Sequence, residues 1–232
     1  MSDIKFDSKR ADKYDKEIQI AIPGYTGLHD MAYALLSLNL NAQANLLVVG
    51  SGTGTELVNL SKLHPQWEFT GVDPSADMMA VAEKKLIEQG LSERVKLHIG
   101  VTGELPASKL YDAATLILVM HFLPDDGAKL ALVQSIAKRL KKGAIFILAD
   151  LHGDRNSQQF HHFMAAWKVR EINLGLKSPQ EIAEEFHLRM TAIHYVPEIR
   201  IIELLQTTGF VNIERFYIAY LFGGWVAKFT GV

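Results

Sequence analysis

Residues 46–56 read LLVVGSGTGTE. The first four residues form an apolar run that is typical of a strand buried on both faces of a parallel sheet. The three glycines that follow, each one residue apart, permit a sharp turn and let a ligand lie against bare backbone. From Thr55 onward, apolar residues continue at helical spacing. A strand, a glycine turn and the start of a helix together predict a nucleotide-binding crevice.

The spacing of the glycines distinguishes between kinds of nucleotide site. Gly50, Gly52 and Gly54 follow the pattern GxGxG, whereas the dinucleotide fingerprint GxGxxG requires a glycine at position 55. Because Thr55 stands there, a nicotinamide oxidoreductase is the less favoured alternative. An ordinary strand-to-helix turn without a ligand is the other alternative for this stretch.

The composition restricts the classes of protein to which the chain can belong. Its 232 residues are 48% hydrophobic and 22% charged, which is typical of a soluble globular protein. The longest apolar run, residues 113–120 with one Thr, is too short to span a bilayer, and the charged N-terminus does not resemble a signal peptide. We therefore expect a cytoplasmic protein. The absence of cysteine excludes disulfides and Cys-based zinc sites, and the net charge of −2 gives no overall attraction to nucleic acid or membrane.

Strands and helices alternate through residues 44–150. We expect strands at 46–49, 67–72, 95–99, 113–120 and 144–149, and helices at 55–63, 75–89 and 126–140. This alternation predicts a parallel sheet with helices on both of its faces.

The flanking segments complete the predicted domain. Residues 1–43 contain a helical stretch with Met31, Leu35 and Leu38 on one face, and residues 155–208 are mostly helical, so these two segments are expected to form a cap. Residues 209–232 predict a closing hairpin whose strands, 210–220 and 225–229, are separated by Gly223 and Gly224. The expectation is a single α/β domain with a Rossmann-like, doubly wound, mostly parallel seven-stranded sheet.

An acidic residue ends the second predicted strand, residues 67–74 (WEFTGVDP). Asp73 lies about 20 residues after the glycines, where a carboxylate can accept hydrogen bonds from both hydroxyl groups of a ribose. The structural alternative is a helix cap beside Ser75 and Asp77, and the two roles are compatible.

Other candidates follow the ends of the predicted strands. Met78 begins the next helix, where it would contact an adenine face or simply pack in the core. Val101 and Thr102 follow the third strand and would frame the adenine edge. His121 follows the fourth strand at the same sheet edge as the glycines, so its position points to chemistry, although a structural histidine is the alternative.

Taken in order, the segments GSGTG, VDPSADMM, LILVMHFLPD and LKKGAIFILAD resemble the Rossmann-like S-adenosylmethionine-dependent methyltransferases over residues 45–150. The resemblance implies that the glycine loop meets the methionine end of S-adenosylmethionine and that Asp73 binds its ribose. The terminal hairpin is also a trait of that family. The cofactor-binding residues predicted on this basis are Tyr14, Tyr25, Gly50, Ser51, Gly52, Gly54, Asp73, Pro74, Met78, Val101, Thr102 and Leu118.

The flanks resemble a narrower group, the carboxy-S-adenosylmethionine synthases of tRNA wobble-uridine modification. This resemblance rests on residues 22–25 (IPGY), residues 162–190 and the segment from LLQTTGF to GWVA. It implies that Tyr25 closes over the cofactor. We therefore retain such a synthase as an alternative function.

Several positions depart from the patterns of these families. Leu204 stands where an arginine would hold the extra carboxylate of the synthases, although Arg200 lies one turn away. Val101 replaces an acid, and Ile117 or Leu118 replaces an asparagine. Val48 occupies the position where many methyltransferases carry an acid, so backbone carbonyls near Gly50 or a water would hold the cofactor's amino group. The departures from the synthase pattern, at Leu204, Val101 and Ile117 or Leu118, favour the use of a plain methyl donor.

Candidates for a catalytic base are histidines near the predicted cleft. We consider His121, His152, His161 and His162, with Asp150 at the end of the fifth strand, and predict His121 and His162 as catalytic. His161 and His162 are neighbours in a predicted helix, so their side chains point about 100° apart and only one is expected to face the pocket. Neighbouring residues do not share a helix face as metal ligands would, so we predict no metal site.

The expected partner is a small-molecule methyl acceptor. The basic run 138–142 lies at a helix end, where cations suit the helix dipole, and it has no aromatic stacking platform, so nucleic-acid binding is not predicted. A homodimer is a further expectation from the cap. A non-catalytic protein that binds S-adenosylmethionine is the remaining alternative.

Overall fold

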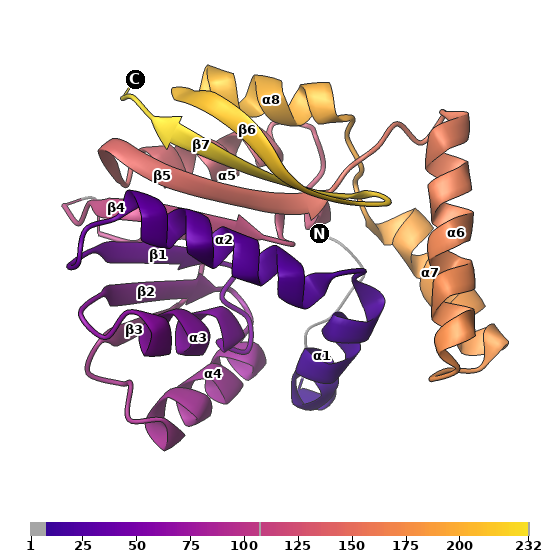
Figure 1. The fold of residues 1–232 in the computed structure, drawn as a ribbon, viewed down its shortest axis with the longest axis horizontal. Coiled ribbons are helices and arrows are strands. Elements are labelled where there is room, and N and C mark those ends of the chain that lie inside the picture. The colour runs from indigo at the N-terminus through magenta and orange to yellow at the C-terminus, as the bar shows by residue number, and fades with distance from the viewer. Residues whose placement is uncertain (1–7, 107, 232) are drawn as a thin grey trace.

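The computed structural model describes residues 8–106 and 108–231. Seven strands form one sheet in the order β3-β2-β1-β4-β5-β7-β6 (Figure 1). They are β1 Asn45–Val49, β2 Glu68–Asp73, β3 Val95–Ile99, β4 Tyr111–Ile117, β5 Leu140–Leu151, β6 Phe210–Ala219 and β7 Phe222–Phe229. Strands β1 to β5 pair in parallel, while β7 is antiparallel to both β5 and β6. The predicted fold class, a parallel core with a C-terminal antiparallel hairpin, is confirmed.

Helices lie on both faces of this sheet. They are α1 Ser8–Ala21, α2 Tyr25–Asn39, α3 Thr55–Leu63, α4 Ala76–Glu88, α5 Ala128–Ala137, α6 Gln158–Leu174, α7 Pro179–Ala192 and α8 Glu198–Thr207, with 3₁₀ turns at Thr102–Glu104 and Met120–Phe122. Helices α2 and α3 pack into the hydrophobic cluster on one face, and α5 and α8 pack into the cluster on the other. Helices α6 and α7 stand at the side of the sheet with α1 nearby (Figure 1), and we call these three helices the cap. Helices α2 and α8 also belong to the segments predicted to form a cap, but they pack on the faces of the sheet.

The central strand β1 explains why its sequence is apolar throughout. Leu46 and Val48 belong to the cluster on one face, whereas Leu47 and Val49 belong to the cluster on the other. All four side chains are at most 5% exposed. Successive side chains of a strand point to opposite faces, so a strand that is covered on both faces must be apolar at every position.

The apolar face that we named on α2 is not the one that meets the core. Met31 is 39% exposed and Leu38 is 80% exposed, and Leu35 is partly buried. The buried residues of this helix are Leu28, His29, Ala32, Tyr33 and Leu36. The helix has apolar residues on both faces, so periodicity alone did not identify the inward one.

The turn of the closing hairpin also differs from the prediction. The chain turns at Tyr220, which has φ 53°, and both Gly223 and Gly224 lie inside β7. A Cβ atom at Gly223 would lie 2.4 Å from the Trp225 ring, and one at Gly224 would lie 2.9 Å from the Phe216 ring. These glycines therefore leave space for neighbouring aromatic side chains, and they do not form the turn.

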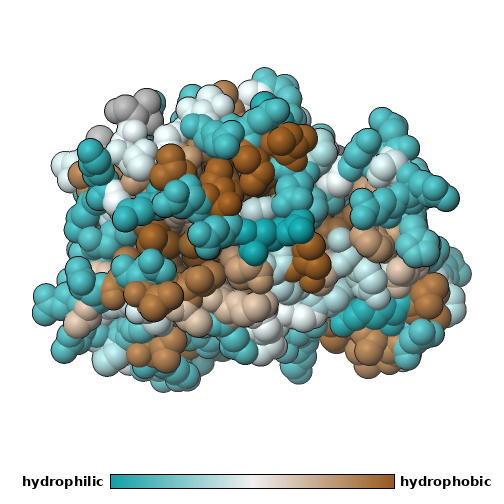
Figure 2. All heavy atoms as spheres, turned by 45° about the horizontal axis from the view of Figure 1, so that its top comes forward, coloured by the Kyte–Doolittle hydropathy of each residue, from teal (hydrophilic) through white to brown (hydrophobic). Residues whose placement is uncertain are grey.

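Hydrophobic residues also reach the surface. Figure 2 shows them on one face of the molecule in several groups that hydrophilic residues separate. Among the helices that the structure describes, none is long and apolar enough to cross a membrane. The homodimer and the cytoplasmic location remain predictions.

Candidate active site

A cavity of about 370 Å³ opens at the carboxyl ends of the parallel strands β1 to β4. We call it the main cavity. Its lining includes Tyr14, Val49, Gly50, Gly52, Val72, Asp73, Pro74, Met78, Val101, Thr102, Leu118 and Phe122. Parallel strands bring their carboxyl ends to one edge of the sheet, so segments far apart in the sequence meet there.

The three predicted glycines have different roles in the loop beside this cavity. All three lie in the left-handed region, with φ 72° at Gly50, 50° at Gly52 and 77° at Gly54. A Cβ atom at Gly50 would lie 2.1 Å from Val119 Cγ2, and one at Gly54 would lie 2.8 Å from Ala82 Cβ. At Gly52 the nearest atom would be 3.9 Å away. Gly50 and Gly54 therefore allow close packing, whereas Gly52 leaves a free face of backbone at the cavity.

Asp73 joins the glycine loop to the end of β2. Its Oδ2 accepts a hydrogen bond from the backbone N–H of Gly52 at 2.9 Å, and its Oδ1 accepts one from that of Ser75 at 2.9 Å. Burial raises the pKa of Asp73, and these two hydrogen bonds oppose the shift. Ser75 caps α4, since its Oγ accepts from the N–H of Met78. Asp73 thus accepts a hydrogen bond at the start of α4, as the capping alternative predicted, and it also lines the cavity, while ribose binding stays a prediction.

The remaining wall of the main cavity is largely apolar. Met78 is 2% exposed and Leu118 is 8% exposed, while Val101 is 55% exposed at the rim. Thr102 is buried, and its Oγ1 has no hydrogen-bond partner within the described residues. An orphaned hydroxyl beside apolar walls suits a flat heteroaromatic ring that carries a polar edge.

Three of the predicted cofactor-binding residues do not line the cavity. Ser51 Oγ points to Met79 Sδ at 3.3 Å, and Gly54 is covered by α4. Tyr25 begins α2, and its ring packs edge-on against His29 with the ring centroids 4.5 Å apart. Burial raises the pKa of Tyr25 above its usual range. Tyr14, by contrast, comes from α1 and lines the cavity.

A smaller cavity of about 110 Å³ adjoins the first, and both are lined by Tyr14, Leu118 and Phe122. We call it the side cavity. Its other lining residues are Ile18, Ala21, Ile22, His121, Leu151, Trp167, Arg189, Ile193 and Phe222. The cap helices α1, α6 and α7 supply much of this wall, so the side cavity exists only in the folded chain.

His121 lines the side cavity and forms a buried pair with Asp150, which does not line it. His121 is 4% exposed and Asp150 is 1% exposed. His121 Nδ1 contacts Asp150 Oδ1, which also accepts a hydrogen bond from the N–H of Leu151 at 2.8 Å. The main-chain oxygen of His121 accepts a hydrogen bond from the N–H of His194. Asp150 therefore holds the ring through Nδ1, and the bond from His194 fixes the backbone of His121.

The other candidate histidines lie elsewhere. His161 and His162 are both exposed on α6 and line neither cavity. His152 lies against Trp225, and its burial lowers its pKa. The inward face of α6 is made by Phe160, Met164 and Trp167, which leaves the paired histidines on the outward side.

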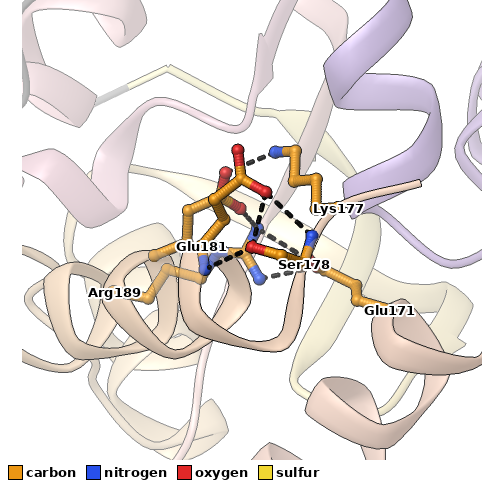
Figure 3. Close-up of polar contacts among 6 residues, drawn as sticks. Glu171, Lys177, Ser178, Glu181 and Arg189 are labelled. Carbon is orange, nitrogen blue, oxygen red and sulfur yellow. Dashed lines mark hydrogen bonds and ion pairs between the residues drawn. The ribbon is translucent and has the colours of Figure 1, made fainter. Parts of the chain in front are cut away.

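Arg189 is a cavity residue that sequence reasoning did not single out. Its guanidinium pairs with Glu171 at 2.6 Å and Glu185 at 3.2 Å, and it lies 4.3 Å from the centre of the Trp167 ring. Figure 3 shows Arg189 and Glu171 beside the turn between α6 and α7, where Ser178 contacts Glu181. Glu185 is a neighbour within α7, but Glu171 and Trp167 come from α6, so no local pattern marks Arg189 as a cavity residue.

Among the positions that depart from the family patterns, Val101, Ile117 and Leu118 line the main cavity, and the others lie away from both cavities. Val48 is fully buried in the sheet. Leu204 is 1% exposed on the buried face of α8, and Arg200 of the same helix pairs on the surface with Asp125 at 2.9 Å. In the part of the chain that is described, no three His, Asp or Glu residues gather as metal ligands would.

A family model for a methyltransferase domain matches residues 47–146. A demethylmenaquinone methyltransferase of Lactiplantibacillus plantarum is 26% identical over 223 residues, which cover 94% of this chain and 91% of that protein. A carboxy-S-adenosyl-L-methionine synthase of Campylobacter hominis is 25% identical over 231 residues, which cover 97% of this chain and 94% of that protein.

Solved structures agree on the fold. A SAM-dependent methyltransferase from Aquifex aeolicus superposes with a TM-score of 0.63 at 18% identity. The match covers 97% of this chain and 99% of the Aquifex chain. An O-methyltransferase family protein from Burkholderia thailandensis has a TM-score of 0.66 at 13% identity and covers 97% of this chain. This chain spans only 61% of that Burkholderia chain, so the longer protein's activity does not transfer to it. The resemblance to methyltransferases that the motifs indicated is confirmed.

Proposed function

We propose that this chain, an enzyme of the S-adenosylmethionine-dependent methyltransferase class, binds S-adenosylmethionine in the main cavity and methylates a small-molecule acceptor. The observation that carries the proposal is the pairing of Asp73 with the open backbone of Gly52 at the cavity wall. A carboxylate at the tip of β2 beside bare backbone suits a ribose next to a charged, flexible tail.

The residues around the main cavity fit this cofactor. Asp73 keeps free lone pairs that can accept from ribose hydroxyls, because each of its oxygens accepts one backbone hydrogen bond. Met78 and Leu118 provide apolar contacts for an adenine ring, and Thr102 Oγ1 offers it a hydrogen-bond partner. Tyr14 covers the point where the two cavities meet, and an aromatic face there would stabilise a sulfonium charge.

The chain contributes to the reaction by positioning the reactants and excluding water from them. The bound cofactor supplies an electrophilic methyl group. Orienting an acceptor in line with it accounts for about 7 kcal/mol or more of the barrier. The side cavity suits the acceptor, since it shares Tyr14, Leu118 and Phe122 with the main cavity.

Binding of the product S-adenosylhomocysteine to the purified protein tests this proposal. We expect wild-type protein to bind it in calorimetry and to retain S-adenosylmethionine or S-adenosylhomocysteine on purification, identified by mass. Asp73→Asn keeps the side-chain size but loses the charge, and we expect affinity to fall about 100-fold, or about 3 kcal/mol. Asp77→Ala removes a similar charge from an exposed position nearby and serves as the control. Unchanged affinity in Asp73→Asn would contradict the ribose assignment.

A carboxy-S-adenosylmethionine synthase activity is the second candidate, and the match to such synthases over most of the chain favours it. The charges near the cavities argue against it. Arg200 and Leu204 line neither cavity, and Arg189 is already paired with Glu171. Mass spectrometry of the bound small molecule distinguishes the two activities, because the synthase product is heavier by a carboxyl group.

A further inference from the structure

We propose that the side cavity binds a neutral, single-ring acceptor with one acidic hydroxyl group, a phenol, and that His121 accepts the hydroxyl proton while Asp150 positions His121. This inference rests on the proposed function, since it names the acceptor of the same site. Three features support it: the hydrogen bonds of the His121–Asp150 pair, the size of the side cavity and its charge.

The hydrogen bonds around His121 leave one ring nitrogen for a substrate. Asp150 Oδ1 contacts Nδ1, and the carboxylate is held in place by the N–H of Leu151. A carboxylate partner on Nδ1 favours the tautomer in which Nδ1 carries the proton and Nε2 carries the lone pair. No described residue hydrogen-bonds to Nε2, although His121 lines the side cavity. Nε2 is therefore the base that the cavity offers.

The volume of the side cavity limits the acceptor to one ring at most. The side cavity measures about 110 Å³, which is less than the cavity of about 150 Å³ known to hold benzene. A single ring therefore has to extend toward the main cavity, which the side cavity adjoins at Tyr14, Leu118 and Phe122. Trp167, Phe122 and Phe222 supply aromatic walls for such a ring. A two-ring acceptor does not fit unless the cap moves.

The charge of the cavity wall selects a neutral acceptor. Arg189 is the one Lys or Arg among the described lining residues, and Glu171 and Glu185 neutralise it. Glu171 is itself only 5% exposed, so this pairing is screened little by solvent. A carboxylate acceptor would therefore find no free cation, whereas a hydroxyl group finds Nε2 of His121.

The reaction balances with these groups alone. The O–H bond of the acceptor breaks and its proton passes to Nε2 of His121. The oxygen's electron pair forms the new bond to the methyl carbon, while the methyl–sulfur bond breaks and its pair remains on sulfur. The products are a methyl ether and S-adenosylhomocysteine, and His121 later releases its proton to water.

A single-ring phenol that reports its own ionisation provides the test. 4-Nitrophenol absorbs visible light as the phenolate, and it quenches tryptophan fluorescence when it lies beside Trp167. Below its pKa we expect it to bind wild-type protein in the absence of the methyl donor and to become partly ionised on binding. In His121→Gln we expect binding within about threefold, without the added ionisation. His187→Gln, at an exposed position on α7, is the matched control.

Competition against 4-nitrophenol tests size and charge. Phenol should compete at least tenfold better than either 2-naphthol, which has two rings, or benzoate, which is charged. Equal competition by naphthol would overturn the size argument, and stronger competition by benzoate would overturn the charge argument.

Turnover separates the roles of the pair. With a phenol that is methylated, His121→Gln should lower kcat about 100-fold or more with little change in KM. Asp150→Asn should also lower kcat and shift its pH profile, because the Nδ1 partner changes. Failure of 4-nitrophenol to bind, or binding without ionisation, overturns this inference. The proposed function stands in that case if S-adenosylhomocysteine still binds and depends on Asp73.

Discussion

At the scale of single residues, the glycine loop shows that one motif contains different physical requirements. Gly50 and Gly52 both have positive φ, but a Cβ atom at Gly50 would clash with Val119, while one at Gly52 would make an ordinary van der Waals contact with Met78 at 3.9 Å. The pattern GxGxG predicted that glycines were needed here. It did not say which glycine packs and which one faces a ligand, because that depends on what the fold places opposite each.

Alanine substitutions should separate these two roles. Gly50→Ala combines about 1–2 kcal/mol of left-handed strain with a clash, so we expect a clear loss of stability in thermal unfolding. Gly52→Ala carries only the strain, and its methyl group would project toward the cavity. For Gly52→Ala we expect the loss of affinity for S-adenosylhomocysteine to exceed the loss of stability. Equal stability of Gly50→Ala and wild type would contradict the packing role.

A buried acid beneath the loop gives a pH prediction. Glu56 is 9% exposed, and burial raises its pKa to about 7. The folded state therefore binds a proton more tightly than the unfolded chain, for which the pKa is 4.5. Stability contributed by the protonated acid is present below pH 4.5 and is lost as pH rises toward 7, at a cost of about 3 kcal/mol.

The isosteric variant Glu56→Gln should remove that dependence. Urea unfolding at pH 8 should find the variant more stable than wild type, and the difference should shrink near pH 5. Tyr25 and Tyr33 lie close enough to feel its charge, but both keep their protons because burial raises their pKa. If the free energy of unfolding of the wild type does not fall relative to that of Glu56→Gln between pH 5 and 8, the raised pKa of Glu56 is wrong.

At the scale of elements, α1 is fastened to the glycine loop by one carboxylate. Asp15 accepts hydrogen bonds from Thr53 at 2.5 Å and Thr55 at 3.0 Å, and it pairs with Lys85 of α4. Burial alone would raise the pKa of Asp15, but the hydrogen bond from Lys85 and the other partners bring it below its usual value. Tyr14, which precedes Asp15 in α1, lines both cavities, so the contacts of Asp15 fix the backbone that carries Tyr14.

We expect Asp15→Asn to loosen α1 without unfolding the sheet. The variant keeps the side-chain size but loses the ion pair with Lys85. Hydrogen exchange in α1 should become faster, while that of β1 and β4 should stay unchanged. Affinity for S-adenosylhomocysteine should fall about threefold to tenfold, or about 0.7–1.4 kcal/mol. Glu17→Gln, in the same helix, is the control.

The cap provides a prediction about specificity. Glu171→Gln leaves Arg189 with only the partly exposed Glu185, so the side cavity gains positive character. We expect benzoate to bind this variant better than wild type, with a stability cost of about 1–3 kcal/mol, because Arg189 loses a buried charged partner but keeps Glu185. Glu184→Gln, which is exposed on the same helix as Arg189, is the control. Unchanged benzoate binding would show that Glu171 does not set the charge of the cavity.

At the scale of the whole molecule, the two cavities draw on different parts of the chain. The main cavity is built almost entirely from the β1 to β4 region, in which the motifs lie close together in sequence. The side cavity instead joins α1, the turn after β4, α6, α7 and β7. Trp167 Nε1 donates to the main-chain oxygen of Ala21, and Arg170 donates to that of Ile20, so α6 also holds the end of α1.

The sequence by itself determined the alternation of strands and helices, the glycine loop and the acid at the end of the second strand. Each of these follows from local steric and hydrophobic rules that act over a few residues. It did not determine which face of α2 is buried, that Gly223 and Gly224 sit beside aromatic rings, or that His121 meets Asp150 across 29 positions. Those depend on which elements lie next to one another, and that is settled only when the chain packs as a whole.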